Sequence, residues 1–98
     1  MAHEIHRVTD FQHLGGFTLR VTFADGTNQA IDFAPVLAGE VYGPLADPQI
    51  FRQVRIDPES HTLVWPNGAD FDPAQLHDWP QVRDAFARLA QSWSGAHV

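Results

Sequence analysis

The sequence predicts a small α+β domain in which antiparallel β-hairpins form one small sheet and helices pack on one face of it. Two patterns support this class. Apolar and polar residues alternate in the first half of the chain, whereas the last part carries an apolar stripe at helical spacing. A chain of 98 residues can build only one core, so we expect a single domain over residues 1–98.

The clearest strand pattern is a hairpin over residues 17–33. A three-residue loop at 24–26, with its glycine in the left-handed conformation, places Leu19 opposite Ile31 and gives both strands one apolar face. A two-residue turn would split the apolar residues between two faces, so we predict the longer loop. Residues 5–11 form a weaker candidate strand before this hairpin.

Three Asp-Pro pairs punctuate the middle of the chain. The pairs that begin at Asp47 and Asp72 each offer a capping carboxylate before a proline at the first helical position. They predict short helices near residues 47–53 and 73–78. The pair that begins at Asp57 instead opens the loop of a second hairpin.

The C-terminal segment, residues 80–94, is predicted to carry an amphipathic helix over residues 80–93 that packs on the sheet. Gly95 is the predicted end of this helix, and Asp84 and Arg88 are expected to pair on its exposed side. Apolar residues recur at spacings of three and four, which is the period of one helical face. The residues of this stripe are Val82, Phe86, Leu89, Ala90 and Trp93.

Composition excludes several kinds of chemistry. The chain has no cysteine, which rules out disulfides, thiol catalysis and thiolate zinc sites. Its net charge of −6 disfavours direct nucleic-acid binding, because phosphates are repelled by a negative surface. No apolar run approaches the roughly 18 residues that span a bilayer, and the N-terminus lacks a secretory signal, so we expect a cytoplasmic protein without membrane contact. Neither a Gly-flanked serine nor a phosphate-binding loop is present.

Six histidines raise the question of a metal site, because imidazole is a common metal ligand. His3, His6 and His13 crowd the N-terminus, but on a strand His3 and His6 point to opposite faces, and His13 is expected in a loop. No His-x-x-x-His pair of the kind that binds metal on a helix exists. We therefore expect solvated histidines and assign no metal and no cofactor.

The acidic residues that follow Trp65 are the remaining candidates for chemistry. Asp70, Asp72 and Asp78 form a local cluster beside His77, and two nearby carboxylates are able to do acid–base work if burial raises one pKa. The structural alternative is that Asp72 caps a helix and Asp70 binds amides of the preceding Asn-Gly turn. We favour the structural interpretation, and core packing for Trp65 unless it is partly exposed beside the acids.

Several segments together resemble the bacterial domain-of-unknown-function family 2442 over about residues 5–79. They are Phe23-Ala24-Asp25-Gly26, Gly43-Pro44-Leu45 with Asp47 and Phe51, and Leu63-Val64-Trp65-Pro66-Asn67-Gly68-Ala69-Asp70. The resemblance implies a small α+β fold without an established activity, and an antitoxin-like role for some members toward toxins encoded beside them. It supplies no catalytic residues. Some members append a helix-turn-helix module, whereas residues 80–98 hold one helix, so DNA binding by that route is not expected.

The sequence therefore predicts a non-enzymatic protein-interaction module that binds and neutralises a basic, nucleic-acid-handling protein, such as a small ribonuclease toxin, by charge complementarity. An inhibitor that mimics nucleic acid stays open as a variant of this function. The alternatives are a small enzyme or a ligand- or metal-binding protein at Asp70, Asp72 and Asp78 near Trp65, and a homodimer with a structural role. The candidate contact residues are Trp65, Asn67, Asp70, Asp72, Asp78, Arg83 and Arg88.

Overall fold

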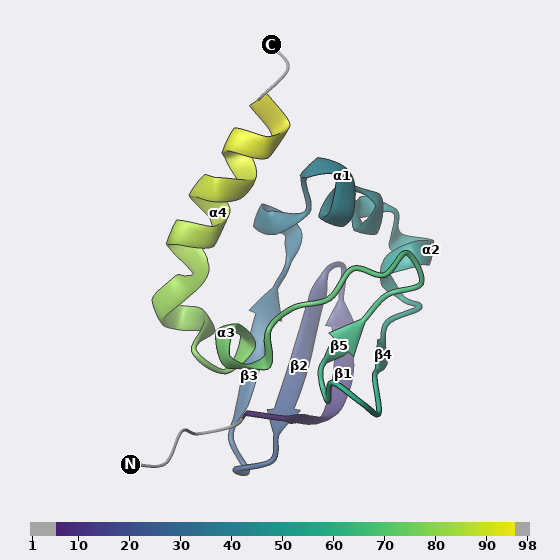
Figure 1. The fold of residues 1–98 in the computed structure, drawn as a ribbon, viewed down its shortest axis with the longest axis vertical. Coiled ribbons are helices and arrows are strands. Elements are labelled where there is room, and N and C mark those ends of the chain that lie inside the picture. Colours follow the sequence, from purple (N-terminus) through teal and green to yellow (C-terminus); the bar gives the residue numbers. More distant parts are fainter. Residues whose placement is uncertain (1–5, 96–98) are drawn as a thin grey trace.

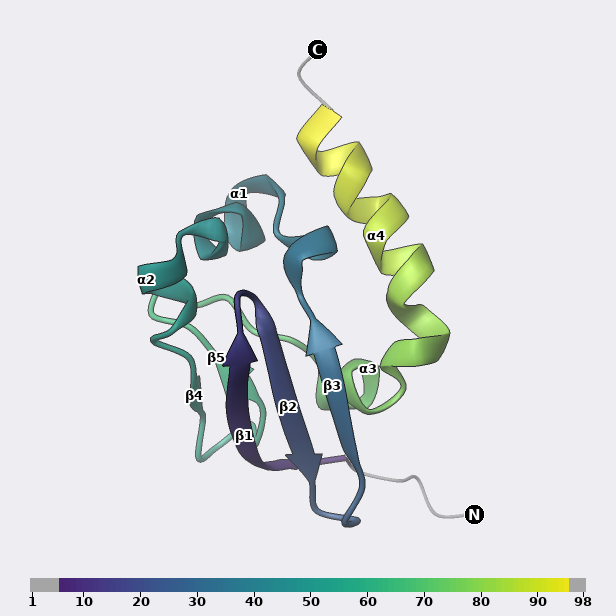
Figure 2. The ribbon, with the colours of Figure 1, turned by 180° about the vertical axis from the view of Figure 1, so that it is seen from behind.

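The computed structural model describes residues 6–95, which form an α+β fold of two antiparallel sheets and several helices (Figure 1). The predicted class is confirmed, but the hairpins form two sheets instead of one. The second hairpin lies over the larger sheet instead of extending its edge, as both views show (Figures 1 and 2). The strands are β1 (Val8–Gly15), β2 (Thr18–Phe23) and β3 (Asn28–Asp32) in the larger sheet, and β4 (Arg55–Ile56) and β5 (Leu63–Val64) in the smaller.

Both hairpin registers agree with the sequence patterns. Leu19 lies opposite Ile31, and the loop between β2 and β3 contains Gly26 with φ of 89°, which is the left-handed conformation that glycine adopts without steric penalty. In the second hairpin Ile56 lies opposite Leu63 and the backbone N–H of Asp57 donates to the carbonyl oxygen of Thr62, so residues 58–61 form the loop that the Asp-Pro pair opens. These registers put the apolar residues of each hairpin on one face.

The first strand differs from its predicted position. We expected a strand over residues 5–11, whereas β1 begins at Val8 and continues to Gly15, and His13 lies in the strand opposite Leu19 instead of in a loop. Gly15 and its neighbour Gly16 have φ values of 121° and 53°, and Gly15 pairs with Thr18, so the strand includes Gly15 and the chain reverses at Gly16 and Phe17. The beginning of the predicted strand lies outside the described residues.

Short helices connect the sheets, and a long helix follows them. The carboxylates of Asp47 and Asp72 accept hydrogen bonds from Gln49 N and Ala74 N, each at 2.9 Å, as the two Asp-Pro pairs predicted. The helices between β3 and α2 were not predicted. The helices are η1 (Ala34–Val36), α1 (Gly39–Tyr42), η2 (Gly43–Ala46), α2 (Pro48–Phe51), α3 (Pro73–His77) and α4 (Trp79–Gly95).

The helix α4 packs beside the sheet with most of the predicted stripe. Ala90 is buried and Val82 and Phe86 are half-buried against the core, but Leu89 is 53% exposed and lies outside it. The stripe is thus narrower than predicted, because the core covers only the side of α4 nearest η1 and α1. The side chain of Trp93 lies outside the described residues.

The core is largely aromatic and lies between the inner face of the larger sheet, the β4–β5 hairpin and the helices. Phe33, which directly follows β3, contacts the rings of Phe51, Trp65, Phe71 and Trp79. The opposite face of the sheet carries mainly polar residues and faces the viewer in Figure 2 without a helix over it. Within residues 6–95, no helix combines the length and the hydropathy that a membrane span requires.

Candidate functional site

Trp65, a predicted contact residue, is part of the core. Its side chain is 1% exposed, and its indole N–H donates a hydrogen bond of 2.9 Å to the carbonyl oxygen of Phe51. A buried indole whose polar atom is satisfied has no surface left for a partner. The structure therefore supports the packing role of Trp65, which the sequence analysis favoured over a contact role.

Asn67 fixes the turn after Trp65 to a distant segment. Its side-chain oxygen accepts a hydrogen bond of 3.1 Å from Ala69 N, and its amide nitrogen donates one of 2.9 Å to the carbonyl oxygen of Val41. Gly68 has φ of 87°, which completes the turn. We expected Asp70 to bind the amides of this turn; the asparagine does so instead, because its amide offers both a donor and an acceptor.

The three acidic residues of the predicted cluster have different surroundings. Asp72 caps α3, and Asp78 contacts His77. The side chain of Asp70 is exposed, while its backbone oxygen accepts a hydrogen bond of 2.8 Å from the hydroxyl of Tyr42. Burial and the nearby Asp70 carboxylate raise the pKa of Tyr42, so this phenol stays protonated and donates.

His77, at the end of α3, lies between two carboxylates. Its Nε2 is 2.8 Å from Oδ2 of Asp25 in the β2–β3 loop, and its Nδ1 is 3.0 Å from Oδ1 of Asp78. The ring of His6 stacks on that of His77 with centroids 3.8 Å apart, and the His77 side chain is 19% exposed. We call His6, Asp25, His77 and Asp78 the His77 cluster. Sequence reasoning missed this cluster, since it joins segments that are up to 71 residues apart, from position 6 to position 77.

The cluster shifts the proton affinities of its members. The carboxylates of Asp78 and Asp25 hold the pKa of His77 above its ordinary value of 6.5, because each accepts a hydrogen bond from the ring. Hydrogen bonds from the hydroxyl and the backbone N–H of Thr27, and then from His77, hold the pKa of Asp25 below its ordinary value of 3.8. The charged imidazolium and carboxylate therefore stabilise each other near neutral pH.

We predict that thermal stability in a chelator-containing buffer decreases as the pH rises above about 6.5, the ordinary value for histidine. His77 binds its proton more tightly in the folded state, so its contribution is complete below that pH and is lost as the pH rises through the folded pKa. The lowered pKa of Asp25 affects stability at the acidic end of the pH range. There, stability is lost as the pH falls below about 3.8. Melting curves of the wild type and of His77→Gln should diverge below neutral pH and converge in alkali. Parallel curves would contradict this assignment.

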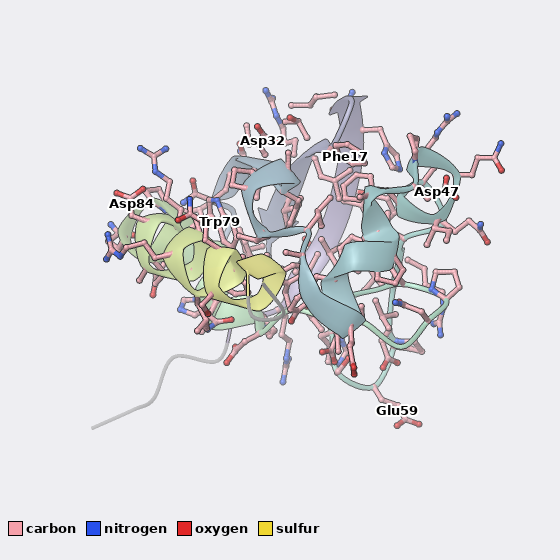
Figure 3. All side chains as sticks on the ribbon, turned by 90° about the horizontal axis from the view of Figure 1, so that it is seen from above. Phe17, Asp32, Asp47, Glu59, Trp79 and Asp84 are labelled. Carbon is pink, nitrogen blue, oxygen red and sulfur yellow. The ribbon has the colours of Figure 1, made fainter. Side chains whose placement is uncertain are left out.

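A groove separates β3 and η1 from α4 and holds a volume of about 340 Å³. The carboxylates of Asp32 and Asp84 belong to its two walls, and Figure 3 shows both residues on the same side of the molecule. Arg83 also lines it, with Nε 3.7 Å from Oδ1 of Asp84, so Asp84 pairs with this arginine and not, as predicted, with Arg88. We call this feature the β3–α4 groove; its lining residues are Ala30, Asp32, Pro35, Val36, Trp79, Arg83, Asp84 and Ala87.

A family model with the description "Protein of unknown function (DUF2442)" matches residues 8–80 of the chain. This range contains both sheets, the turn that follows Trp65, and all of the His77 cluster except His6. No curated protein and no solved structure matches the chain.

Proposed function

This chain belongs to the DUF2442 family of proteins of unknown function, and we propose that it is a non-enzymatic interaction module that binds and neutralises a basic, nucleic-acid-handling protein in the cytoplasm. One observation carries the proposal. The edge strand β3 faces a groove whose walls carry two exposed carboxylates, in a chain with a net charge of −6. An antitoxin-like inhibitor of a small basic toxin fits this description.

The edge of β3 offers backbone groups to an incoming strand. The hydrogen bond of 2.9 Å from Phe33 N to Phe17 O identifies one hydrogen-bonded pair of the β2–β3 ladder. In an antiparallel ladder, hydrogen-bonded pairs alternate with pairs whose backbone groups point away from the partner strand. The backbone N–H and C=O groups of Ala30 and Asp32 therefore point away from β2. Both residues line the groove. An extended segment of a partner is therefore able to add to this edge as a further strand.

The charges of the groove favour a basic segment. Asp32 and Asp84 are both exposed, so lysine or arginine side chains on an added strand reach them without burying a charge. Arg83 offsets part of this charge, but its contact with Asp84 is long and both side chains are largely exposed, and such pairs contribute little. Opposite charges also speed the encounter with a basic protein, and salt screens that attraction.

We predict that a short synthetic peptide of alternating lysine and valine binds the protein, and that rising salt weakens the binding. The double variant Asp32→Asn with Asp84→Asn should lower the affinity by about 2- to 30-fold, since each exposed pair contributes about 0.2–1 kcal/mol. Asparagine at position 32 keeps an acceptor for Ala34 N, which Asp32 binds at 3.0 Å. Fluorescence anisotropy with a labelled peptide gives the affinity, and amide chemical shifts should change at Ala30 and Asp32.

The matched control neutralises two exposed acids elsewhere, with Glu40→Gln and Glu59→Gln. It has the same net charge as the test variant, and Glu59 lies far from the groove in Figure 3. If both double variants lose the same affinity, net charge and not the groove explains the binding. Binding that does not respond to salt, or shift changes that miss β3, would contradict the proposal.

A ligand- or metal-binding protein remains the second candidate function. The observation that favours it is the His77 cluster, which includes Asp78 of the predicted acidic turn. Asp72 is engaged in capping α3, and Trp65 is buried, so this candidate does not use the whole set of residues that the sequence suggested.

A further inference from the structure

We propose that His6, His77 and Asp78 bind one divalent transition-metal ion of the zinc type, and that this ion joins the N-terminal segment to α3. One potential ligand atom from each of these residues lies within 4.8 Å of the other two. This inference is independent of the β3–α4 groove. It revises the sequence-based expectation that no metal site is present, which considered only ligands that are close in the sequence.

The fold brings the members of the His77 cluster together from three segments. His6 opens the described chain, His77 ends α3, and Asp25 belongs to the β2–β3 loop (Figure 1). The position of α3 against this loop is fixed by Gln29, whose side-chain nitrogen donates a hydrogen bond of 2.9 Å to the backbone oxygen of His77. Because the ring of Phe23 also meets His77 edge-on, with centroids 5.0 Å apart, the orientation of the imidazole is restricted before any ion binds.

Asp25 selects the nitrogen of His77 that faces the ion. Its Oδ2 lies 2.8 Å from Nε2, where it accepts the proton that the ring keeps when an ion occupies Nδ1. A carboxylate that accepts the second N–H of a ligating histidine is the usual arrangement around protein-bound zinc. Asp25 is thus a positioning residue and not a ligand.

Distances on the Nδ1 side suit a tetrahedral ion. Nδ1 of His77 lies 3.0 Å from Oδ1 of Asp78, whereas two ligands on tetrahedral zinc lie about 3.4 Å apart, given metal–ligand distances of about 2.1 Å. The two groups need to separate by a few tenths of an ångström, as the proton between them is replaced by the ion. The ring of His6 also needs to turn out of its stack on His77, because the lone pair of an imidazole nitrogen, and so the bound ion, lies in the plane of the ring. Two imidazoles and one carboxylate favour zinc, cobalt or nickel over calcium or magnesium, which prefer oxygen ligands. A water molecule completes four-coordination.

Isothermal titration of the full chain with Zn²⁺ tests the site. We expect one ion per chain, proton release on binding, and weaker binding at acidic pH, since the ion displaces the His77 proton. His77→Gln and His6→Gln should each lower the affinity by at least about 100-fold, and Asp25→Asn by about 10- to 100-fold, as for the outer partners of other metal ligands. Asn at position 25 retains an acceptor for Thr27 N, so the loop is preserved.

The control is His61→Asn, which removes an exposed histidine outside the cluster. His61 has φ of 55°, and asparagine tolerates this conformation, so the variant should fold and bind Zn²⁺ as the wild type does. Zn²⁺ should also raise the melting temperature of the wild type and of His61→Asn, but not of His6→Gln. Equal affinities for the wild type and both ligand variants would overturn the proposal. Loss of binding in His3→Gln with retention in His6→Gln would also overturn it.

Discussion

Trp65→Ala is expected to lower the free energy of unfolding by about 3–5 kcal/mol, the range for deleting a large buried aromatic side chain. The indole is 1% exposed and contacts the rings of Phe33, Phe51 and Phe71, with centroids 5.7–6.0 Å away. Its loss leaves a cavity and also removes the donor for the Phe51 carbonyl oxygen. Because small domains have stabilities of about 5–15 kcal/mol, this variant should be close to unfolding.

Urea unfolding of Trp65→Ala and Trp65→Phe separates the contribution of ring packing from that of the indole hydrogen bond. Phenylalanine keeps much of the packing but leaves the Phe51 carbonyl oxygen without its indole donor. We therefore expect Trp65→Phe to lower the free energy of unfolding by about 1–3 kcal/mol. Leu89→Ala is the control, since Leu89 is 53% exposed and should change stability by less than about 0.5 kcal/mol. A loss in Trp65→Ala no greater than that of the control would show that Trp65 belongs to a surface and not to the core.

Features set by neighbouring residues were predictable from the sequence. The loop with Gly26 follows from the need to keep Leu19 and Ile31 on one face, and a shift of one residue would place them on opposite faces. The caps by Asp47 and Asp72 involve backbone amides only two residues away. In each case the competing arrangement costs free energy locally, so no knowledge of the rest of the fold is needed.

Features set by tertiary contacts were not predictable. The helices between residues 34 and 46 are three or four residues long, and helices of that length are not stable alone. The exposure of Leu89 depends on where the body of the domain ends beside α4, which the stripe does not encode. Likewise, the β4–β5 hairpin packs over the sheet because β1 and β4 meet there, and the alternation of residues is the same for either placement.

At the candidate site, too, contacts between neighbouring residues were predictable and contacts between distant segments were not. Asp78 and its neighbour His77 were recognised from the sequence, but the second carboxylate, Asp25, is 52 residues away and reaches His77 only through the β2–β3 loop. The signal that places it there is Gln29, which binds the end of α3, and no local pattern identifies such a bond. Spacing rules for metal ligands detect sites within one helix or hairpin, whereas the His77 cluster joins three segments.

Phe33→Ala should also lower the free energy of unfolding by about 3–5 kcal/mol and should loosen α4. The Phe33 side chain is fully buried and contacts the rings of Phe51, Trp65, Phe71 and Trp79, with centroids 5.1–6.0 Å away. Trp79 is the first residue of α4, and η1, which follows Phe33, packs against that helix. Deleting the ring therefore removes the contact that holds the start of α4 to the end of β3.

Hydrogen exchange distinguishes this effect from a uniform loss of stability. Amides of α4 should exchange faster in Phe33→Ala than global unfolding alone explains, because the helix opens separately when its packing surface is lost. The matched control is Phe17→Ala, on the paired position of the same hairpin, since Phe17 is half-buried and meets Phe51 at a centroid distance of 5.2 Å. Phe17→Ala should lower the free energy of unfolding by less than Phe33→Ala does, and it should leave the amides of α4 protected from exchange. If both variants release α4 equally, the helix is held by the hairpin as a whole, and Phe33 has no special part in its docking.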